Sequence, residues 1–182
     1  MPMIYTDSHA PHQAMHCSQT ITSGELKDHS SNPFAKEHFE VSFAASNIQS
    51  SGDVKIETGP GVMFNHMYPW NWVMHASGRS YITFTTNLTE EEAAKDLEFN
   101  IRQLSSIVRG QGHSPIAIEV NGQIIADRVL PQVDGWRNDR FSLKGRLVAG
   151  ENKFTIRLLS DAWSNYWIEK ASITLPNANL WE

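Results

Sequence analysis

The feature that most constrains the fold is a series of short runs between residues 116 and 167, in which apolar and polar side chains alternate. A period of two puts successive side chains on opposite faces of a β-strand, whereas a helix needs a period near 3.6. Two tight turns join these runs. One is Asn121-Gly122, a strong hairpin signal because a type I′ turn needs two residues that tolerate positive φ, and the other spans residues 149–152. The pattern predicts antiparallel strands at residues 116–120, 141–143 and 154–158.

Alternation elsewhere predicts more strands, at residues 39–43, 54–57, 80–86, 97–102 and within 167–175. Thr89 with Glu92 three residues later fits a capping box, so residues 90–95 are expected to form one helical turn. Roughly eight short strands without a long amphipathic helix predict an all-β fold, an antiparallel β-sandwich. The polar, aperiodic residues 1–35 are predicted to be an irregular N-terminal arm, and residues 36–182 the β-sandwich domain.

Composition excludes several classes of partner. The chain of 182 residues has 15 Lys and Arg against 20 Asp and Glu, and its formal charge of -5 argues against binding nucleic acid. Cys17, the one cysteine, cannot form an internal disulfide. No run approaches the ~20 apolar residues of a membrane span. The first twenty residues lack the pattern of a secretory signal, so we expect a cytoplasmic protein, secreted only if this is a mature form.

If successive strands alternate in direction, the connections between them fall alternately at the two ends of the sandwich. The short connections, at 87–95, 121–122 and 149–152, then share what we call the turn end. The long ones, at 64–78, 104–114, 131–139 and 160–165, share what we call the loop end, and they are rich in aromatic and charged residues. Aromatic side chains beside a few polar groups suit an amphipathic organic ligand, although the tryptophans could instead close the core.

The segment Ile118-Glu119-Val120-Asn121-Gly122, followed by residues 141–143 and by Gly150-Glu151-Asn152 leading into an Ile-containing strand, resembles the galactose-binding-domain-like superfamily. That superfamily includes many carbohydrate-binding modules and the last domain of rhamnogalacturonan lyases. The resemblance covers about residues 81–175 and implies a jelly roll. It also implies aromatic platforms that stack on sugar rings while Asn, Asp and Arg bond the hydroxyl groups. The expected ligand-binding residues at the loop end are Tyr68, Trp70, Trp72, Trp136, Arg137, Asn138, Trp163, Asn165 and Tyr166.

Two functions fit these residues. One is a carbohydrate-binding-module-like protein without turnover, whose partner is a glycan or another small molecule. The other is an intracellular natural-product cyclase or isomerase. There Asp134, Asp139 or Asp161, desolvated by indoles, would donate a proton from a raised pKa, and His66 or His75 would act as the base. The sequence leaves the choice, the ligand and the oligomeric state open.

No metal site and no cofactor are predicted. Structural calcium is frequent in modules of this kind, but a clear acidic cluster near the first strand is lacking here. Asp53 and Glu57 are interpreted as exposed strand charges.

Overall fold

The computed structural model describes residues 19–21, 37–43, 48–64, 72–105, 113–131 and 135–181, with the backbone alone at 19–21, 37 and 72. These residues form a sandwich of short strands with one helical turn, α1 (Glu90–Ala93). The strands are β1 (Gln19–Ile21), β2 (Glu37–Ser42), β3 (Gln49–Gly52), β4 (Val54–Thr58), β5 (Val62–Phe64), β6 (Trp72–Met74), β7 (Tyr81–Leu88), β8 (Glu98–Ser105), β9 (Ile116–Val120), β10 (Gln123–Val129), β11 (Arg137–Ser142), β12 (Gly150–Leu158) and β13 (Tyr166–Thr174).

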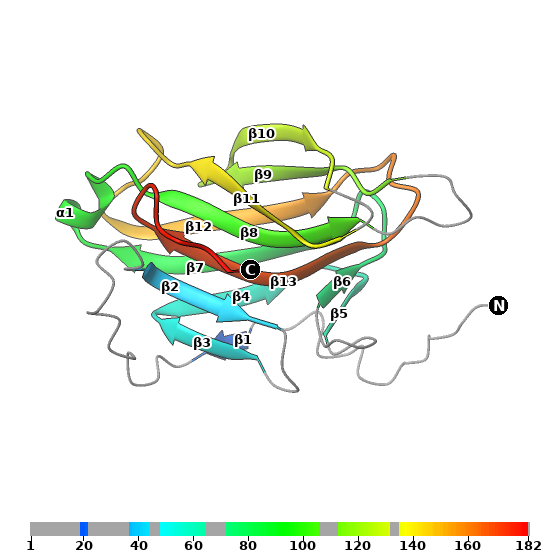
Figure 1. Ribbon diagram of the computed structural model, residues 1–182, viewed down its shortest axis with the longest axis horizontal. Coiled ribbons are helices and arrows are strands. Elements are labelled where there is room, and N and C mark those ends of the chain that lie inside the picture. Colours follow the sequence, from blue (N-terminus) through cyan, green and yellow to red (C-terminus); the bar gives the residue numbers. More distant parts are fainter. Residues whose placement is uncertain are drawn as a thin grey trace.

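The strands form two sheets that pack face to face (Figure 1). The sheet we call sheet A has the order β1-β4-β7-β12-β9-β10, and the other, sheet B, has the order β11-β8-β13-β2-β3. In sheet B, β6 also pairs with the start of β13, and β5 pairs with β6. All strand pairs of the described residues are antiparallel. The antiparallel sandwich predicted from the sequence is therefore confirmed.

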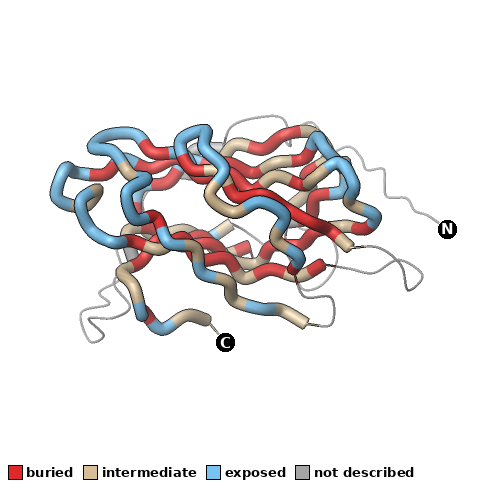
Figure 2. The backbone as a smooth tube through the Cα atoms, turned by 90° about the horizontal axis from the view of Figure 1, so that it is seen from above, coloured by how far each residue is buried: buried red, intermediate tan, exposed pale blue. Residues whose placement is uncertain are grey.

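The core lies between the sheets and is built around phenylalanine rings. Phe154 of sheet A packs against Phe99 and Phe39 of sheet B, with ring centroids 5.5 and 6.4 Å apart. Phe84 of sheet A lies 6.1 Å from Phe39. All four rings are fully buried, and Figure 2 shows buried residues along both layers with exposed residues gathered on the turns. The alternation that predicted the strands places one face of each sheet in this core.

Side chains and backbone together fix the geometry of the turn end. Asn121 and Gly122 have φ values of 50° and 82°, as the predicted type I′ turn requires. The side chain of Asn121 accepts a hydrogen bond from the Lys153 amide (2.8 Å) and donates one to Oδ1 of Asn152 (2.9 Å). Asn152 is fully buried and bonds both main-chain groups of Val148. Two asparagines thus tie the 121–122 and 149–152 turns together.

The predicted capping box is also present. The Thr89 hydroxyl accepts from the Glu92 amide (3.1 Å), and the Glu92 carboxylate accepts from the Thr89 amide (2.9 Å). Only four residues follow in helical conformation, so α1 serves as a capped connection between the two sheets. Within the described residues, no helix has the length and hydrophobicity needed to cross a membrane.

Strand β10 forms one edge of sheet A and is irregular. Its pairing with β9 shifts register twice, between Ile124 and Ala126 and again between Ala126 and Val129. Within the second shift, Arg128 has a φ of 60°, which is uncommon for a residue with a side chain. The bulges turn Arg128 toward the loop end, where its side chain meets residue 161.

The final residues cross the outer face of sheet B. After β13 the chain turns back over β8 and β13, as Figure 1 shows in red near the label C. Arg140 of β11 donates a 2.5 Å hydrogen bond to the Ala178 carbonyl, and Asn138 donates to the Trp181 carbonyl. The Trp181 indole donates to Glu40 of β2 (2.8 Å). We call residues 175–181 the C-terminal segment, and it covers polar side chains that would otherwise face solvent.

Three local expectations need correction. The segment 1–35 was expected to be irregular, but β1 lies within it and pairs with β4, as the outermost strand of sheet A. Residues 137–139 were expected in a loop, but β11 begins at Arg137 and pairs with β8. Strands β3, β5 and β6 were not expected, because they are short and β3 has the polar sequence Gln-Ser-Ser-Gly, which shows no alternation.

Candidate functional site

The loop end presents one large aromatic side chain to solvent. Trp163, between β12 and β13, is 70% exposed, the most of any large hydrophobic residue described. Its backbone is held on both sides: the Trp163 amide donates to the His113 carbonyl (2.9 Å), and Ser77 donates to the Ala162 carbonyl (2.8 Å). An exposed indole on a restrained turn is a preorganised surface for a ring-shaped ligand.

A buried serine cluster supports this turn. The Ser105 hydroxyl at the end of β8 accepts from the Ser114 amide (2.9 Å) and contacts its hydroxyl (3.0 Å). The Ser114 hydroxyl in turn lies 2.9 Å from the Ser164 carbonyl and 2.5 Å from that of Asn165. The connections after β8 and after β12 are thereby joined beneath Trp163. Three of the four connections that strand direction assigned to the loop end meet there, because the Gly78 amide adds the connection after β6 by bonding the Leu158 carbonyl (3.1 Å).

An ion pair lies two residues before the exposed indole. Nη2 of Arg128 is 2.5 Å from Oδ2 of Asp161, and both side chains are about half exposed. The hydrogen bond from Arg128, with its charge and that of His113, holds the pKa of Asp161 below its ordinary value, and the same pair raises the pKa of Arg128. Beside the platform there is therefore a guanidinium donor and an ionised carboxylate acceptor, a combination that suits hydroxyl groups.

The remaining described aspartate of the predicted site supports the core. Asp139 of β11 accepts from Nε2 of Gln103 (2.8 Å) and from Nε of Arg137 (3.1 Å). Gln103 in turn accepts a 2.7 Å hydrogen bond from the hydroxyl of Tyr166, whose side chain is fully buried. Burial, with the charge of Asp139, raises the pKa of Tyr166 well above its ordinary value. Tyr166 was expected to contact ligand, but its ring is part of the core and cannot serve as a surface platform.

Replacing Tyr166 with phenylalanine is expected to lower the free energy of unfolding by about 1 to 2 kcal/mol, because Oε1 of Gln103 loses its donor in a buried site. Denaturant titration measures this. Tyr81→Phe is the matched control, since the Tyr81 ring is partly exposed and lies under the Arg157 guanidinium. Equal stability of the two variants would show that the Gln103 contact contributes nothing.

Other predicted ligand contacts have different places. Asn138 lies on the outer face of sheet B, where it bonds the C-terminal segment and accepts from Arg102 (3.2 Å). Arg137 is exposed and forms an ion pair with Asp139. The side chains of Trp136 and Asn165 are partly buried. His75, a candidate base of the cyclase, is exposed. The backbone of Trp72 belongs to β6. His66, Tyr68, Trp70 and Asp134 lie outside the described residues.

The proposed acid–base chemistry of a cyclase finds no support among the described residues. A carboxyl group that donates a proton needs a raised pKa, whereas that of Asp161 is lowered and Asp139 is bonded by Gln103 and Arg137. No three His, Cys, Asp or Glu side chains in the described ranges gather closely enough to hold a metal ion.

Sequence patterns missed Arg128, Ser105 and Ser114. Arg128 reaches Asp161 because two bulges reorient β10, and a bulge leaves no reliable mark in a single sequence. The serines carry no local signal either, since their contacts join segments that are far apart in the chain.

Comparison with known proteins identifies the fold. The sequence matches no protein-family profile and no curated protein. The structure aligns with the CBM36-1 domain of a multidomain xylanase from the hindgut metagenome of Trinervitermes trinervoides, with a TM-score of 0.50 and 9% identity over 70% of this chain and 100% of that one. The chain has the jelly-roll fold of carbohydrate-binding modules.

Two further similar structures come from Clostridium thermocellum. A family 35 carbohydrate-binding module aligns with a TM-score of 0.47 and 16% identity, over 68% of this chain and 92% of that one. The C-terminal family 22 module of Xyn10B aligns with a TM-score of 0.49 and 9% identity, over 82% and 99%. At these identities the likeness concerns the fold alone; the two antiparallel sheets and the likeness to the CBM36-1 domain bear out the expected jelly roll.

Proposed function

We propose that this protein is a non-catalytic glycan-binding module whose platform is Trp163. The observation that carries the proposal is the 70% exposure of this indole on a turn whose backbone is held from two neighbouring connections. A tryptophan that served the core would be buried, as Trp167 is at 8%.

Arg128 and Asp161 complete the proposed contact surface. The apolar face of a sugar ring would lie on the indole, and its hydroxyl groups would exchange hydrogen bonds with the guanidinium and the carboxylate. Stacking on one indole contributes about 1 to 2 kcal/mol, so the affinity for a short oligosaccharide should be modest. Because the proposal involves no turnover, bound glycan should be recovered unchanged.

The test is to measure binding of a broad set of neutral and acidic oligosaccharides by glycan array and then by titration calorimetry. Trp163→Ala is expected to weaken binding about tenfold or more, with a change in unfolding free energy below about 0.5 kcal/mol because the side chain is exposed. Trp163→Phe should weaken it less, since an aromatic ring remains.

Val148→Ala is the matched control. Val148 is 52% exposed but lies at the turn end, so its truncation should leave binding unchanged. The proposal is wrong if the wild-type protein binds no glycan in the set, or if Trp163→Ala binds as tightly as the wild type.

A further inference from the structure

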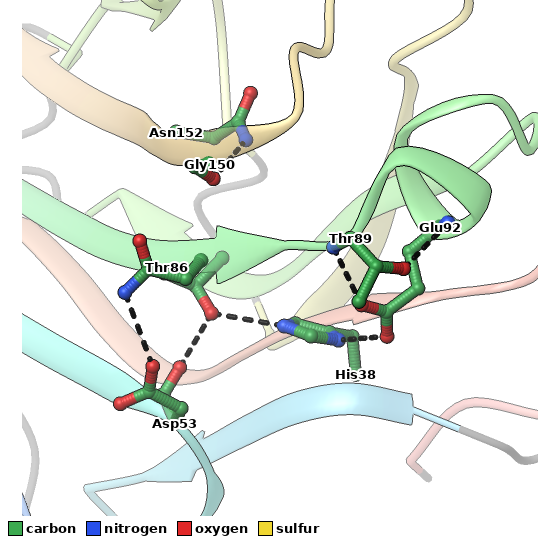
Figure 3. Close-up of polar contacts among 8 residues, drawn as sticks. His38, Asp53, Thr86, Thr89, Glu92, Gly150 and Asn152 are labelled. Atoms are coloured by element: carbon green, nitrogen blue, oxygen red, sulfur yellow. Dashed lines mark hydrogen bonds and ion pairs between the residues drawn. The ribbon is translucent and has the colours of Figure 1, made fainter.

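His38 joins the two sheets at the end of the sandwich opposite Trp163. His38 lies on β2 of sheet B, and its ring contacts β7 of sheet A and the helical turn α1 that follows β7 (Figure 3). Nδ1 lies 2.9 Å from Oε2 of Glu92, and Nε2 lies 3.0 Å from the hydroxyl oxygen of Thr86. The His38 side chain is 17% exposed, and Thr86 is buried.

The Thr86 hydroxyl determines whether Nε2 of the His38 ring carries a proton. Thr86 donates a 2.5 Å hydrogen bond to the main-chain carbonyl of Asp53, which has no proton to give in return. A hydroxyl group has a single proton, so toward His38 the Thr86 oxygen acts as an acceptor. Nε2 of His38 must therefore carry a proton.

Glu92 determines whether Nδ1, the other ring nitrogen, carries a proton. Partial burial raises the pKa of Glu92, but other contacts, hydrogen bonds from Thr89 among them, leave that pKa below its ordinary value. The carboxylate is thus ionised at neutral pH, and an ionised carboxylate only accepts. Nδ1 must donate to it, so with Nε2 also protonated the arrangement requires an imidazolium cation.

We propose that His38 is a pH-sensitive latch between the two sheets, closed as the imidazolium and loosened when Nε2 loses its proton. Once neutral, Nε2 becomes an acceptor and the Thr86 hydroxyl turns to donate to it. The Asp53 carbonyl then loses its donor. Nδ1 keeps its proton, because the Glu92 carboxylate still needs one. The latch is independent of glycan binding at the loop end.

The other acidic side chains described near His38 do not bond its ring. From the connection between β3 and β4, the Asp53 carboxylate accepts from the side chain of Asn87 (3.4 Å). Glu90 and Glu91, the other acids of α1, are exposed. Among the described side chains, Glu92 is the ionised group that bonds His38 directly.

The direction of the pH effect follows from the two partners. The imidazolium makes its contacts in the folded state, so these contacts stabilise the fold at low pH and are lost when the ring gives up a proton at higher pH. The lowered pKa of Glu92 acts oppositely: its contribution is present above the ordinary glutamate value and is lost as pH falls through the lowered one. The latch is closed where Glu92 is ionised and the His38 ring is protonated on both nitrogens.

Nitrogen-15 NMR of the histidine rings in the wild-type protein tests the proposal directly, with His38→Gln used to assign the His38 signals. Two protonated ring nitrogens are expected near about pH 5.5, and a neutral ring protonated on Nδ1 near about pH 8.5. A neutral ring that carries its proton on Nε2 would overturn the proposal, as would a ring already neutral near about pH 5.5.

Denaturant midpoints across the same pH range give a second measurement. The wild-type midpoint should fall as pH rises from about 5.5 to about 8.5, and His38→Gln should remove most of that fall. Thr86→Val, which keeps the shape but removes the hydroxyl, should move the His38 ring transition to lower pH. His75→Gln is the control, because His75 is exposed, and it should keep the wild-type pH dependence. Identical pH profiles for the wild type and His38→Gln would refute the latch.

Discussion

Replacing Phe154 with alanine is expected to lower the free energy of unfolding by about 3 to 5 kcal/mol, the largest effect of any substitution considered. The ring is fully buried and packs against Phe99 and Phe39 of the opposite sheet. Removing it leaves a cavity between two sheets whose backbones are fixed by their own hydrogen bonds and cannot close the space. Denaturant or thermal unfolding followed by circular dichroism would measure the change.

Leu130→Ala is a suitable control for this substitution, because Leu130 is 53% exposed and its truncation should cost less than about 0.5 kcal/mol. Phe154→Leu should fall between the two, since it removes less volume. A cost below about 1 kcal/mol for Phe154→Ala would mean that the sheets do not pack around this ring.

Replacing Asn152 with alanine is expected to cost about 2 to 3 kcal/mol, although the residue lies in a turn. Its buried amide donates to the carbonyls of Val148 (2.7 Å) and Gly150 (3.0 Å). Its oxygen accepts from the Val148 amide (2.9 Å) and from the side chain of Asn121 (2.9 Å). Alanine removes all four of these hydrogen bonds, and the groups that made them must bond water or remain without a partner.

Two other variants make the Asn152 result specific. Asn152→Asp keeps the shape and both acceptor contacts but cannot donate, so an intermediate loss of stability is expected in the same unfolding measurement. Asn179→Ala truncates an exposed asparagine of the C-terminal segment and should be nearly neutral. If Asn152→Ala were as stable as Asn179→Ala, the two turns would not depend on the asparagine pair.

Local chemistry was sufficient to predict the turn end. Asn121-Gly122 specifies a type I′ turn through the φ values it tolerates, and Thr89 with Glu92 specifies a helix start through two reciprocal hydrogen bonds. Alternation predicted the longer strands because each has one face in the core. It missed β3 and the start of β11, whose polar residues are strand only because β2 and β8 pair with them.

The loop end was predicted in outline and not in its details. Strand direction placed the connection that carries Trp163 together with those after β6 and β8, because antiparallel pairing leaves no other arrangement. Residue type could not separate Trp163, which is exposed, from Tyr166, which is buried three positions later. Tyr166 begins β13, pairs with β8 and bonds Gln103 of that strand, whereas Trp163 lies in the preceding turn. Sequence periodicity does not describe such contacts.

The irregularity of β10 also bears on how sheet A ends. An exposed edge strand offers free amides and carbonyls to which a strand of another molecule can add, and regular edges are a common start of aggregation. Here the two register shifts and the left-handed backbone at Arg128 leave only short stretches of regular strand along that edge. The bulges that bring Arg128 to Asp161 therefore also make β10 a poor template for a strand of a neighbouring chain. The edge beside the proposed glycan site is thus less able to form intermolecular strand pairs.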